Sequence, residues 1–238
     1  MQHEATNWLL GVTTRRGLAR LLLPLCLIAV PLAGHAQATK TAAKPSAKAA
    51  AKPVPRILVV GDSISSEYGL PRGSGWVALL QKRLDTGKQK AEVINASISG
   101  DTTSGGRSRL PQLLSKHQPQ VVVLELGGND ALRGLSLQQT RDNLKAMTVA
   151  AQKARAKVLL VGMQVPPNYG PQYTADFAKA FVDVSQAHKV PLVPFLLKGV
   201  GDVPDSQRWF QADRIHPNAQ AQGKLLDNVW PQLQRLLR

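Results

Sequence analysis

Three residues in this 238-residue chain have the types and spacing needed to activate a serine hydroxyl. Gly61-Asp62-Ser63 ends a short apolar run, and its serine becomes a good nucleophile once a base accepts the hydroxyl proton. His216 is the candidate base. Asp213, three residues earlier, could fix the tautomer of that imidazole and stabilise its cation. The chemistry that these side chains would perform together is nucleophilic acyl transfer.

Two further motifs could stabilise the negative charge that such a reaction develops. Residues 95–102 include Gly100, and glycine lets the backbone approach a substrate closely. Gly127-Gly128-Asn129-Asp130 contains an amide that could donate a hydrogen bond to an oxyanion. Each motif taken singly also fits an ordinary turn or helix cap. The chemistry therefore depends on whether the fold brings the motifs together.

The pattern of apolar residues predicts how the motifs are positioned. Short, nearly continuous apolar runs at residues 57–60, 93–98, 121–126, 158–163 and 192–196 are typical of buried parallel strands. Amphipathic, helix-like stretches lie among them at residues 76–84, 110–117, 137–154 and 174–188, and a last one follows Pro217. This alternation predicts one three-layer α/β/α domain with a five-stranded parallel sheet.

In such a sheet, ligands bind at the carboxyl ends of the strands, and the first three motifs each directly follow a predicted strand. The same reasoning places Ser63 at a tight turn that leads into a helix. The N-terminal N–H groups of that helix would face a bound oxyanion.

The first 55 residues have a different composition from the rest. Arg15, Arg16 and Arg20 precede an apolar run at residues 21–32 and a small-residue stretch, which predicts a signal peptide over residues 1–36 and a periplasmic or secreted protein. The run is shorter than the ~20 residues of a membrane-spanning helix. Residues 37–55 are almost entirely Ala, Lys, Pro and Thr and are expected to form a disordered linker. The folded domain is then residues 56–238.

Cysteine and charge limit the classes of function. The one cysteine, Cys26, lies inside the predicted signal peptide, so the mature chain would have no disulfide, thiol nucleophile or thiolate metal site. The net charge is +15, but the chain shows no aromatic-rich basic motif and no zinc pattern. We therefore expect no nucleic-acid partner. We also expect a monomer that makes at most transient contact with a membrane surface or the cell envelope.

The four motifs, in this order, resemble the four sequence blocks of the SGNH (GDSL-type) hydrolases. The resemblance spans nearly all of residues 56–238. Residues 95–102, 124–130 and 166–170 are particularly similar to the bacterial group of multifunctional esterases, thioesterases and lysophospholipases.

The resemblance implies a flavodoxin-like sheet and a role for each motif. Ser63 would be the nucleophile, His216 the base and Asp213 its orienting carboxylate. The oxyanion hole would consist of the backbone N–H groups of Ser63 and Gly100 and the side chain of Asn129. No metal or organic cofactor would take part.

The resemblance also indicates where substrate binds. Residues 165–173 would form a mobile loop that lines the acyl pocket, and we expect Asp62, Asn168 and Tyr169 to contact substrate. Two residues depart from the usual pattern of the group: Glu67 stands where a small residue is common, and Arg214 stands where glycine is common. Our hypothesis is that they form an ion pair across the mouth of the site.

The predicted function is that of an exported serine esterase. Its substrates would be carboxylic esters and thioesters, including lysophospholipids, acyl thioesters and aryl esters. A carbohydrate deacetylase of the cell envelope would use the same residues with a more polar pocket, which the apolar, proline-rich loop at residues 165–173 disfavours. A non-catalytic envelope-binding protein, tethered by the cationic linker, is the second alternative.

Overall fold

The computed structural model describes residues 54–238. The predicted signal peptide and nearly all of the predicted linker lie outside the described residues. Among the residues described, no helix is both long enough and apolar enough to cross a membrane.

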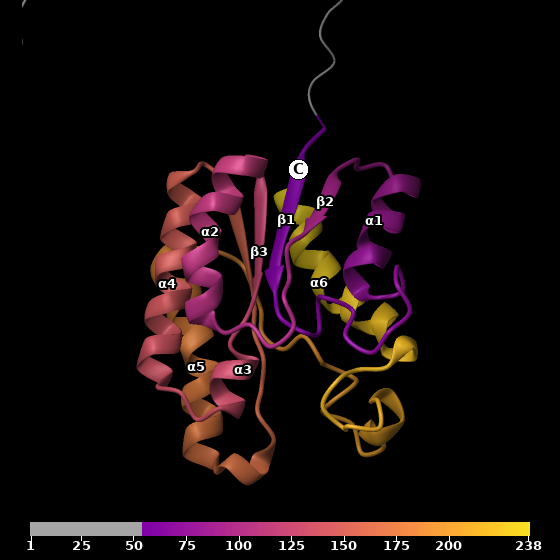
Figure 1. The fold of residues 1–238 in the computed structure, drawn as a ribbon, viewed down its shortest axis with the longest axis vertical. Helices are drawn as coiled ribbons and strands as arrows, with labels where there is room; N and C mark the ends of the chain where they lie inside the picture. Colours follow the sequence, from indigo (N-terminus) through magenta and orange to yellow (C-terminus); the bar gives the residue numbers. More distant parts are fainter. Residues whose placement is uncertain (1–53) are drawn as a thin grey trace, which may run out of the picture. The chain divides into compact units, whose positions relative to one another are not determined.

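The centre of the fold is a parallel sheet of five strands (Figure 1). The strands are β1 (Arg56–Gly61), β2 (Glu92–Asn95), β3 (Val121–Glu125), β4 (Lys157–Val161) and β5 (Leu192–Val193). Their order is β2-β1-β3-β4-β5, which is the flavodoxin-like order. All five residues of β3 are buried, as expected for a strand covered on both faces. The predicted fold class is confirmed.

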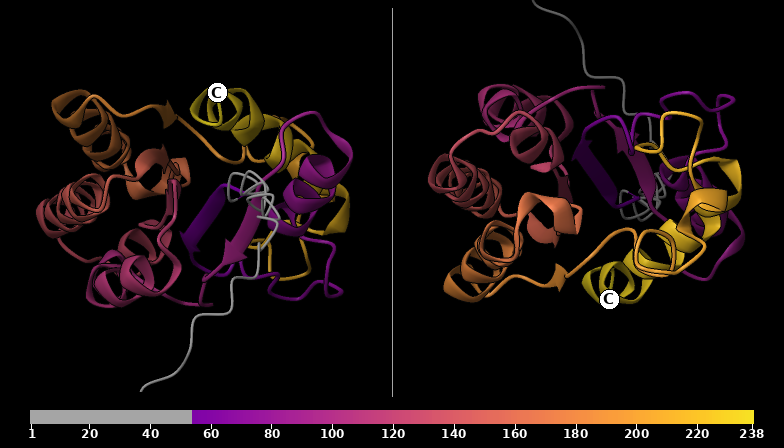
Figure 2. Two further views of the ribbon diagram at one scale, coloured as in Figure 1. Left: turned by 90° about the horizontal axis from the view of Figure 1, so that it is seen from above. Right: turned by 90° about the horizontal axis from the view of Figure 1, so that it is seen from below.

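Helices cover both faces of the sheet, as the two end-on views show (Figure 2). α1 (Trp76–Thr86) and α6 (Gln222–Leu236) pack together on one face. On the other face, α4 (Leu137–Lys153) packs between α2 (Thr103–His117) and α5 (Pro171–His188). In α6, Leu225, Val229 and Leu233 recur every four residues and are buried, so this helix turns one apolar side toward the sheet.

Several predicted boundaries were wrong for local reasons. α2 begins seven residues before the predicted start, because the Thr102 side chain caps it by accepting a hydrogen bond from the Gly105 N–H at 3.3 Å. Gly106 lies in this helix, where a side chain would clash, because a Cβ there would lie 2.2 Å from a methyl carbon of Leu126. The absence of a side chain at Gly106 thus allows the helix to pack closely against Leu126.

Four strands end earlier than predicted, and the largest differences, three residues each, are at β2 and β5. β2 stops at Asn95, and the chain then turns through Gly100, whose φ of 76° is in the left-handed region. β5 stops at Val193 because Pro194 has no N–H to donate to the next ladder position. Both changes lengthen the loops at the carboxyl edge of the sheet.

One helix was not predicted. α3 (Gly128–Leu132) is the next element after β3 and includes Gly128, Asn129 and Asp130 of the third motif, for which an ordinary turn was the alternative to an oxyanion donor. The remaining short elements are 3-10 turns at Pro167–Tyr169, Ser206–Trp209 and Ala219–Ala221. The first of these lies in the predicted acyl-pocket loop, whose last three residues are already the start of α5.

Candidate active site

Ser63 lies in the turn immediately after β1, at the carboxyl edge of the sheet. The prediction that a helix follows Ser63 directly was wrong, since the next helix, α1, begins only at Trp76. A hydrogen-bonded turn replaces it, in which the Ser66 N–H donates to the Asp62 carbonyl at 3.0 Å and the Tyr68 N–H donates to the Ser63 carbonyl at 3.2 Å. Positive φ at Glu67 stops this turn from continuing as a helix.

Ser63, His216 and Asp213 form one continuous hydrogen-bonded chain. His216 Nε2 lies 2.9 Å from Ser63 Oγ, and His216 Nδ1 lies 2.7 Å from Asp213 Oδ2. The other carboxylate oxygen of Asp213 accepts hydrogen bonds from the backbone N–H groups of Ile215 and His216 at 2.9 and 3.0 Å. The carboxylate is therefore held at both oxygens, which fixes the imidazole between it and the serine.

The surroundings of Asp213 keep it ionised. Partial burial raises its pKa, but the hydrogen bonds from the His216 backbone, the His216 imidazole and the Ile215 backbone outweigh this and lower the pKa to about 2. A carboxylate in this position favours the Nδ1–H tautomer of the imidazole, which leaves Nε2 free to accept the serine proton.

Two residues not predicted from the sequence support the histidine. The ring of Tyr68 lies against the imidazole of His216, with 4.5 Å between ring centroids. The side-chain amide of Gln211 donates to the carbonyl of Tyr68 at 2.8 Å, and the backbone N–H of Gln211 donates to the carbonyl of His216 at 2.8 Å. Gln211 therefore ties the histidine loop to the serine loop.

The predicted oxyanion donors follow β1, β2 and β3, which are adjacent strands in the sheet. Within residues 54–238, neither the Ser63 N–H nor the Gly100 N–H donates a hydrogen bond to the protein. The side chain of Asn129, in α3, donates to Asp62 Oδ2 at 3.1 Å. An amide nitrogen has two hydrogens, so one remains for a substrate oxygen.

The prediction that Asp62 contacts substrate was wrong, because its side chain is 2% exposed and faces the protein interior. One oxygen accepts from the Ile64 N–H at 3.0 Å and the other from Asn129. Burial raises the pKa of Asp62 to about 6, against hydrogen bonds and the nearby His216, which lower it.

Asn168 and Tyr169 lie in the 3-10 turn between β4 and α5, and both are exposed. The ring of Tyr169 stacks on that of Tyr173, with centroids 5.9 Å apart. Their role in substrate binding stays a prediction.

The predicted ion pair between Glu67 and Arg214 is also wrong. Both oxygens of Glu67 are used by the protein backbone, accepting from the N–H groups of Gly73 and Gly75 at 2.9 and 2.8 Å. Arg214 forms no salt bridge with Glu67 in the described part of the chain. Arg214 adopts a φ of 57°, which explains why glycine is the common residue there.

Asp130, the last residue of the third motif, has a structural role. It is buried and accepts hydrogen bonds from the Thr103 N–H at 2.9 Å and from the hydroxyl of Thr140 at 3.1 Å, and it also bonds to the Thr103 hydroxyl. These contacts join α2, α3 and α4 beside the site.

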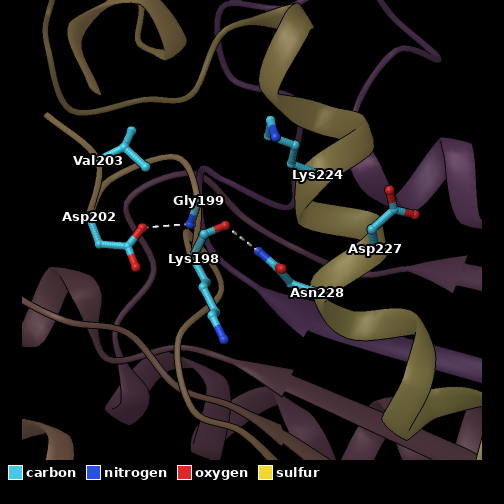
Figure 3. Close-up of a pocket in the computed structure, with 7 residues that line it drawn as sticks. All are labelled: Lys198, Gly199, Asp202, Val203, Lys224, Asp227 and Asn228. Carbon is cyan, nitrogen blue, oxygen red and sulfur yellow. Dashed lines mark hydrogen bonds between the residues drawn. The ribbon is translucent and has the colours of Figure 1, made fainter. Parts of the chain in front are cut away.

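A surface hollow of about 450 Å³ lies away from the triad, between residues 198–203 and α6 (Figure 3). Its polar groups hold the loop in place: the Asn228 amide donates to the carbonyls of Leu196 and Lys198, and the Gly199 N–H donates to Asp202. Within the described residues no group of three His, Cys, Asp or Glu side chains could hold a metal ion.

Comparison with known proteins identifies the family. Residues 59–224 match the GDSL-like lipase/acylhydrolase family. The chain is 54% identical to Esterase TesA of Pseudomonas aeruginosa over 181 residues, 76% of this chain and 89% of the relative. It is 41% identical to Thioesterase 1/protease 1/lysophospholipase L1 of Escherichia coli strain K12, covering 76% of this chain and 84% of the relative.

The fold agrees with a solved structure of the same kind. A crystal structure of TesA superimposes with a TM-score of 0.73 and 52% sequence identity, covering 76% of this chain and 99% of the other. The order of the four motifs, the sheet topology and these similarities agree. This chain belongs to the GDSL-like lipase/acylhydrolase family.

Proposed function

We propose that the protein is an exported serine hydrolase that cleaves carboxylic esters and thioesters through an acyl-enzyme on Ser63. The observation that carries the proposal is the unbroken chain from Asp213 through His216 to Ser63, with contacts of 2.7 and 2.9 Å. The relatives named esterase, thioesterase and lysophospholipase support this range of bonds.

The geometry accounts for each step of such a reaction. Ser63 Oγ attacks the acyl carbon while His216 Nε2 takes the hydroxyl proton, and the carbonyl oxygen becomes an oxyanion. The N–H groups of Ser63 and Gly100 and the amide of Asn129 would donate to this oxygen. The carbon–oxygen or carbon–sulfur bond then breaks, and His216 gives its proton to the leaving group. Water, deprotonated by His216, releases the acid and restores the serine.

The surface around the triad favours acyl substrates over acetylated glycans. Eight large apolar side chains are exposed in the described chain, and six of them lie on the loops and short helix at the carboxyl edge of the sheet. These six, which we call the apolar rim, are Tyr68, Ile98, Leu132, Leu135, Tyr169 and Ile215. A deacetylase that binds polysaccharide would not need so much exposed apolar surface at its entrance.

The apolar rim and two exposed arginines, Arg133 and Arg214, also support transient contact with a lipid surface. Apolar side chains can enter the acyl region while arginines bind anionic headgroups. Ser63→Ala should sediment with phosphatidylglycerol vesicles. A version that also carries Ile98→Ser and Leu132→Ser should no longer do so. The control is Val182→Ser in the same Ser63→Ala background, because Val182 is an exposed apolar residue on α5, outside the apolar rim. Equal sedimentation of all three would exclude the rim as the contact.

The test of activity is hydrolysis of a chain-length series of p-nitrophenyl esters and of matched lysophospholipids by the purified protein and by Ser63→Ala. We expect the wild type to cleave and the variant to be inactive. A folded wild type that cleaves none of these substrates would favour the deacetylase or the binding protein, and acetylated glycans would then be tested.

Export rests on the N-terminal sequence pattern. Cell fractionation tests this expectation. The full chain should give a processed form that is periplasmic or secreted, and a variant in which Arg15, Arg16 and Arg20 are replaced by Glu should lose that form.

A further inference from the structure

Glu125 is a buried acid next to the nucleophile that the mechanism above does not use. It is the last residue of β3, the central strand, and is 2% exposed. In the sheet it pairs with Gly61 of β1, the residue two before Ser63.

One oxygen of Glu125 contacts both sides of the serine turn. Its Oε2 accepts a hydrogen bond from the Ser65 hydroxyl at 2.6 Å and a longer one from the Asp62 N–H at 3.4 Å. Ser63 lies in the chain between these two contacts. The buried Ser65 hydroxyl also accepts a hydrogen bond from the indole nitrogen of Trp76 at 3.1 Å, which fixes its direction toward Glu125.

The glycine of the first motif makes room for this carboxyl group. A Cβ at Gly61 would lie 2.7 Å from Glu125 Oε2 and 2.8 Å from Ser65 Oγ, which is closer than carbon and oxygen atoms can approach without displacement. Gly61 and Glu125 are therefore sterically matched, and the motif depends on a residue 64 positions away in the sequence.

We propose that Glu125 is a positioning residue for the reaction of Ser63, because it bridges Asp62 and Ser65 and so fixes the turn between them. The inference rests on the proposed function, since it concerns the rate at which Ser63 attacks an acyl carbon. A misplacement of about 1 Å in a nucleophile can lower the rate by about 10²-fold.

The neighbouring charges indicate that Glu125 acts as a neutral acid. Burial, and then the negative charge of Asp62, raise the pKa of Glu125 well above its usual value. The hydrogen bonds from Ile64 and Asn129 and the nearby His216 lower the pKa of Asp62 and so favour its ionised form. The negative charge of Asp101 has the opposite effect. Arg109, whose guanidinium donates to the Gly61 carbonyl at 3.4 Å, pairs with Asp101 at 2.7 Å. The burial and the neighbouring negative charge therefore favour the neutral form of Glu125, in which it accepts hydrogen bonds without burying a second charge beside Asp62.

This protonation state determines the variants for the test. Glu125→Gln keeps the length and a neutral acceptor, whereas Glu125→Ala removes the bridge. Ser65→Ala removes one of the two contacts and leaves the acid in place. Glu92→Ala, at an exposed glutamate in β2, is the matched control. Each variant is first checked for folding by circular dichroism and thermal unfolding.

Two readouts separate positioning from general loss of structure. The first is kcat and KM on a short p-nitrophenyl ester. The second is the rate at which a p-nitrophenyl phosphonate labels Ser63, which reports attack by the serine without deacylation. We expect Glu125→Ala to lower kcat and the labelling rate by roughly 10- to 100-fold with little change in KM. Ser65→Ala should show a smaller loss, and Glu125→Gln and Glu92→Ala should stay within about 3-fold of wild type.

Several results would overturn the inference. A folded Glu125→Ala or Ser65→Ala with wild-type kcat and labelling rate would show that the bridge does not position Ser63. An equal loss in Glu125→Gln and Glu125→Ala would show that a neutral acceptor is not sufficient. If the wild type hydrolyses no ester, the proposed function fails, but the labelling rates still decide the role of Glu125.

Discussion

The side-chain amide of Asn129 donates a hydrogen bond to the buried carboxylate of Asp62, with 3.1 Å between the nitrogen and oxygen. The same carboxylate accepts from the N–H of Ile64, the residue after the nucleophile. One buried carboxylate therefore holds both the predicted oxyanion donor and the serine turn. The acidic residue of the first motif acts through its neighbours and does not contact substrate.

Removal of the Asn129 amide should reduce catalysis much more than stability. Asn129→Ala is expected to lower kcat by roughly 10² to 10³, because one preorganised donor to the oxyanion is lost. KM should change little, since the donor acts mainly in the transition state. Steady-state kinetics and thermal unfolding measure the two effects, and an unchanged kcat would remove Asn129 from the oxyanion hole.

Asp62 should make stability fall as the pH rises. Its pKa is about 6 in the folded protein, against 3.8 for an ordinary aspartate. The contribution of Asp62 to the free energy of unfolding is therefore fully present below pH 3.8 and is lost as the pH rises through 6. The loss is on the order of 3 kcal/mol. Glu125, whose pKa is also raised, adds a change of the same sign.

Urea unfolding of wild type and Asp62→Asn between pH 4 and 7.5 tests this expectation. As the pH rises, the unfolding free energy of the wild type should fall relative to that of Asp62→Asn, because the asparagine does not ionise. Asp213 does not interfere, because its lowered pKa affects stability only in more acidic solution. Parallel curves for the two proteins would contradict the assignment.

Asp213→Asn should leave the fold intact and greatly reduce activity. The amide cannot supply the negative charge that selects the Nδ1–H tautomer and stabilises the imidazolium, so we expect kcat to fall by about 10⁴-fold. The exposed Asp205, which pairs with Arg208 at 3.0 Å, offers a control in Asp205→Asn. A residual kcat within tenfold of wild type would mean that Asp213 does not orient the base.

Arg214→Gly should stabilise the protein. A non-glycine residue in the left-handed region costs about 1 to 2 kcal/mol, and Arg214 has a φ of 57° without an ion pair to Glu67. Glu67→Ala should instead destabilise by about 1 to 3 kcal/mol, because it leaves the N–H groups of Gly73 and Gly75 without their acceptor.

The double variant of Glu67 and Arg214 tests whether these residues interact. Because they share no contact, their effects on unfolding free energy should add to within about 0.5 kcal/mol. A larger coupling energy would restore the ion pair that the structure argues against.

The sequence by itself determined the sheet and the chemical groups of the site. The apolar runs located all five strands, and the topology of parallel strands placed Ser63, Gly100 and Asn129 at one edge. Asp213 and His216 could be predicted as partners because they lie only three residues apart in the sequence. These features depend on backbone periodicity and on short motifs, which are visible along the chain.

The tertiary structure decided what depends on distant side chains. The contact between His216 and Ser63 joins residues 153 positions apart. The sequence also could not show that Asp62 points inward to Asn129, that Glu67 binds backbone and not Arg214, or that Glu125 lies against Gly61. A polar side chain turns toward buried groups that lack a hydrogen-bond partner. Which groups are buried is decided only when the helices and strands pack together.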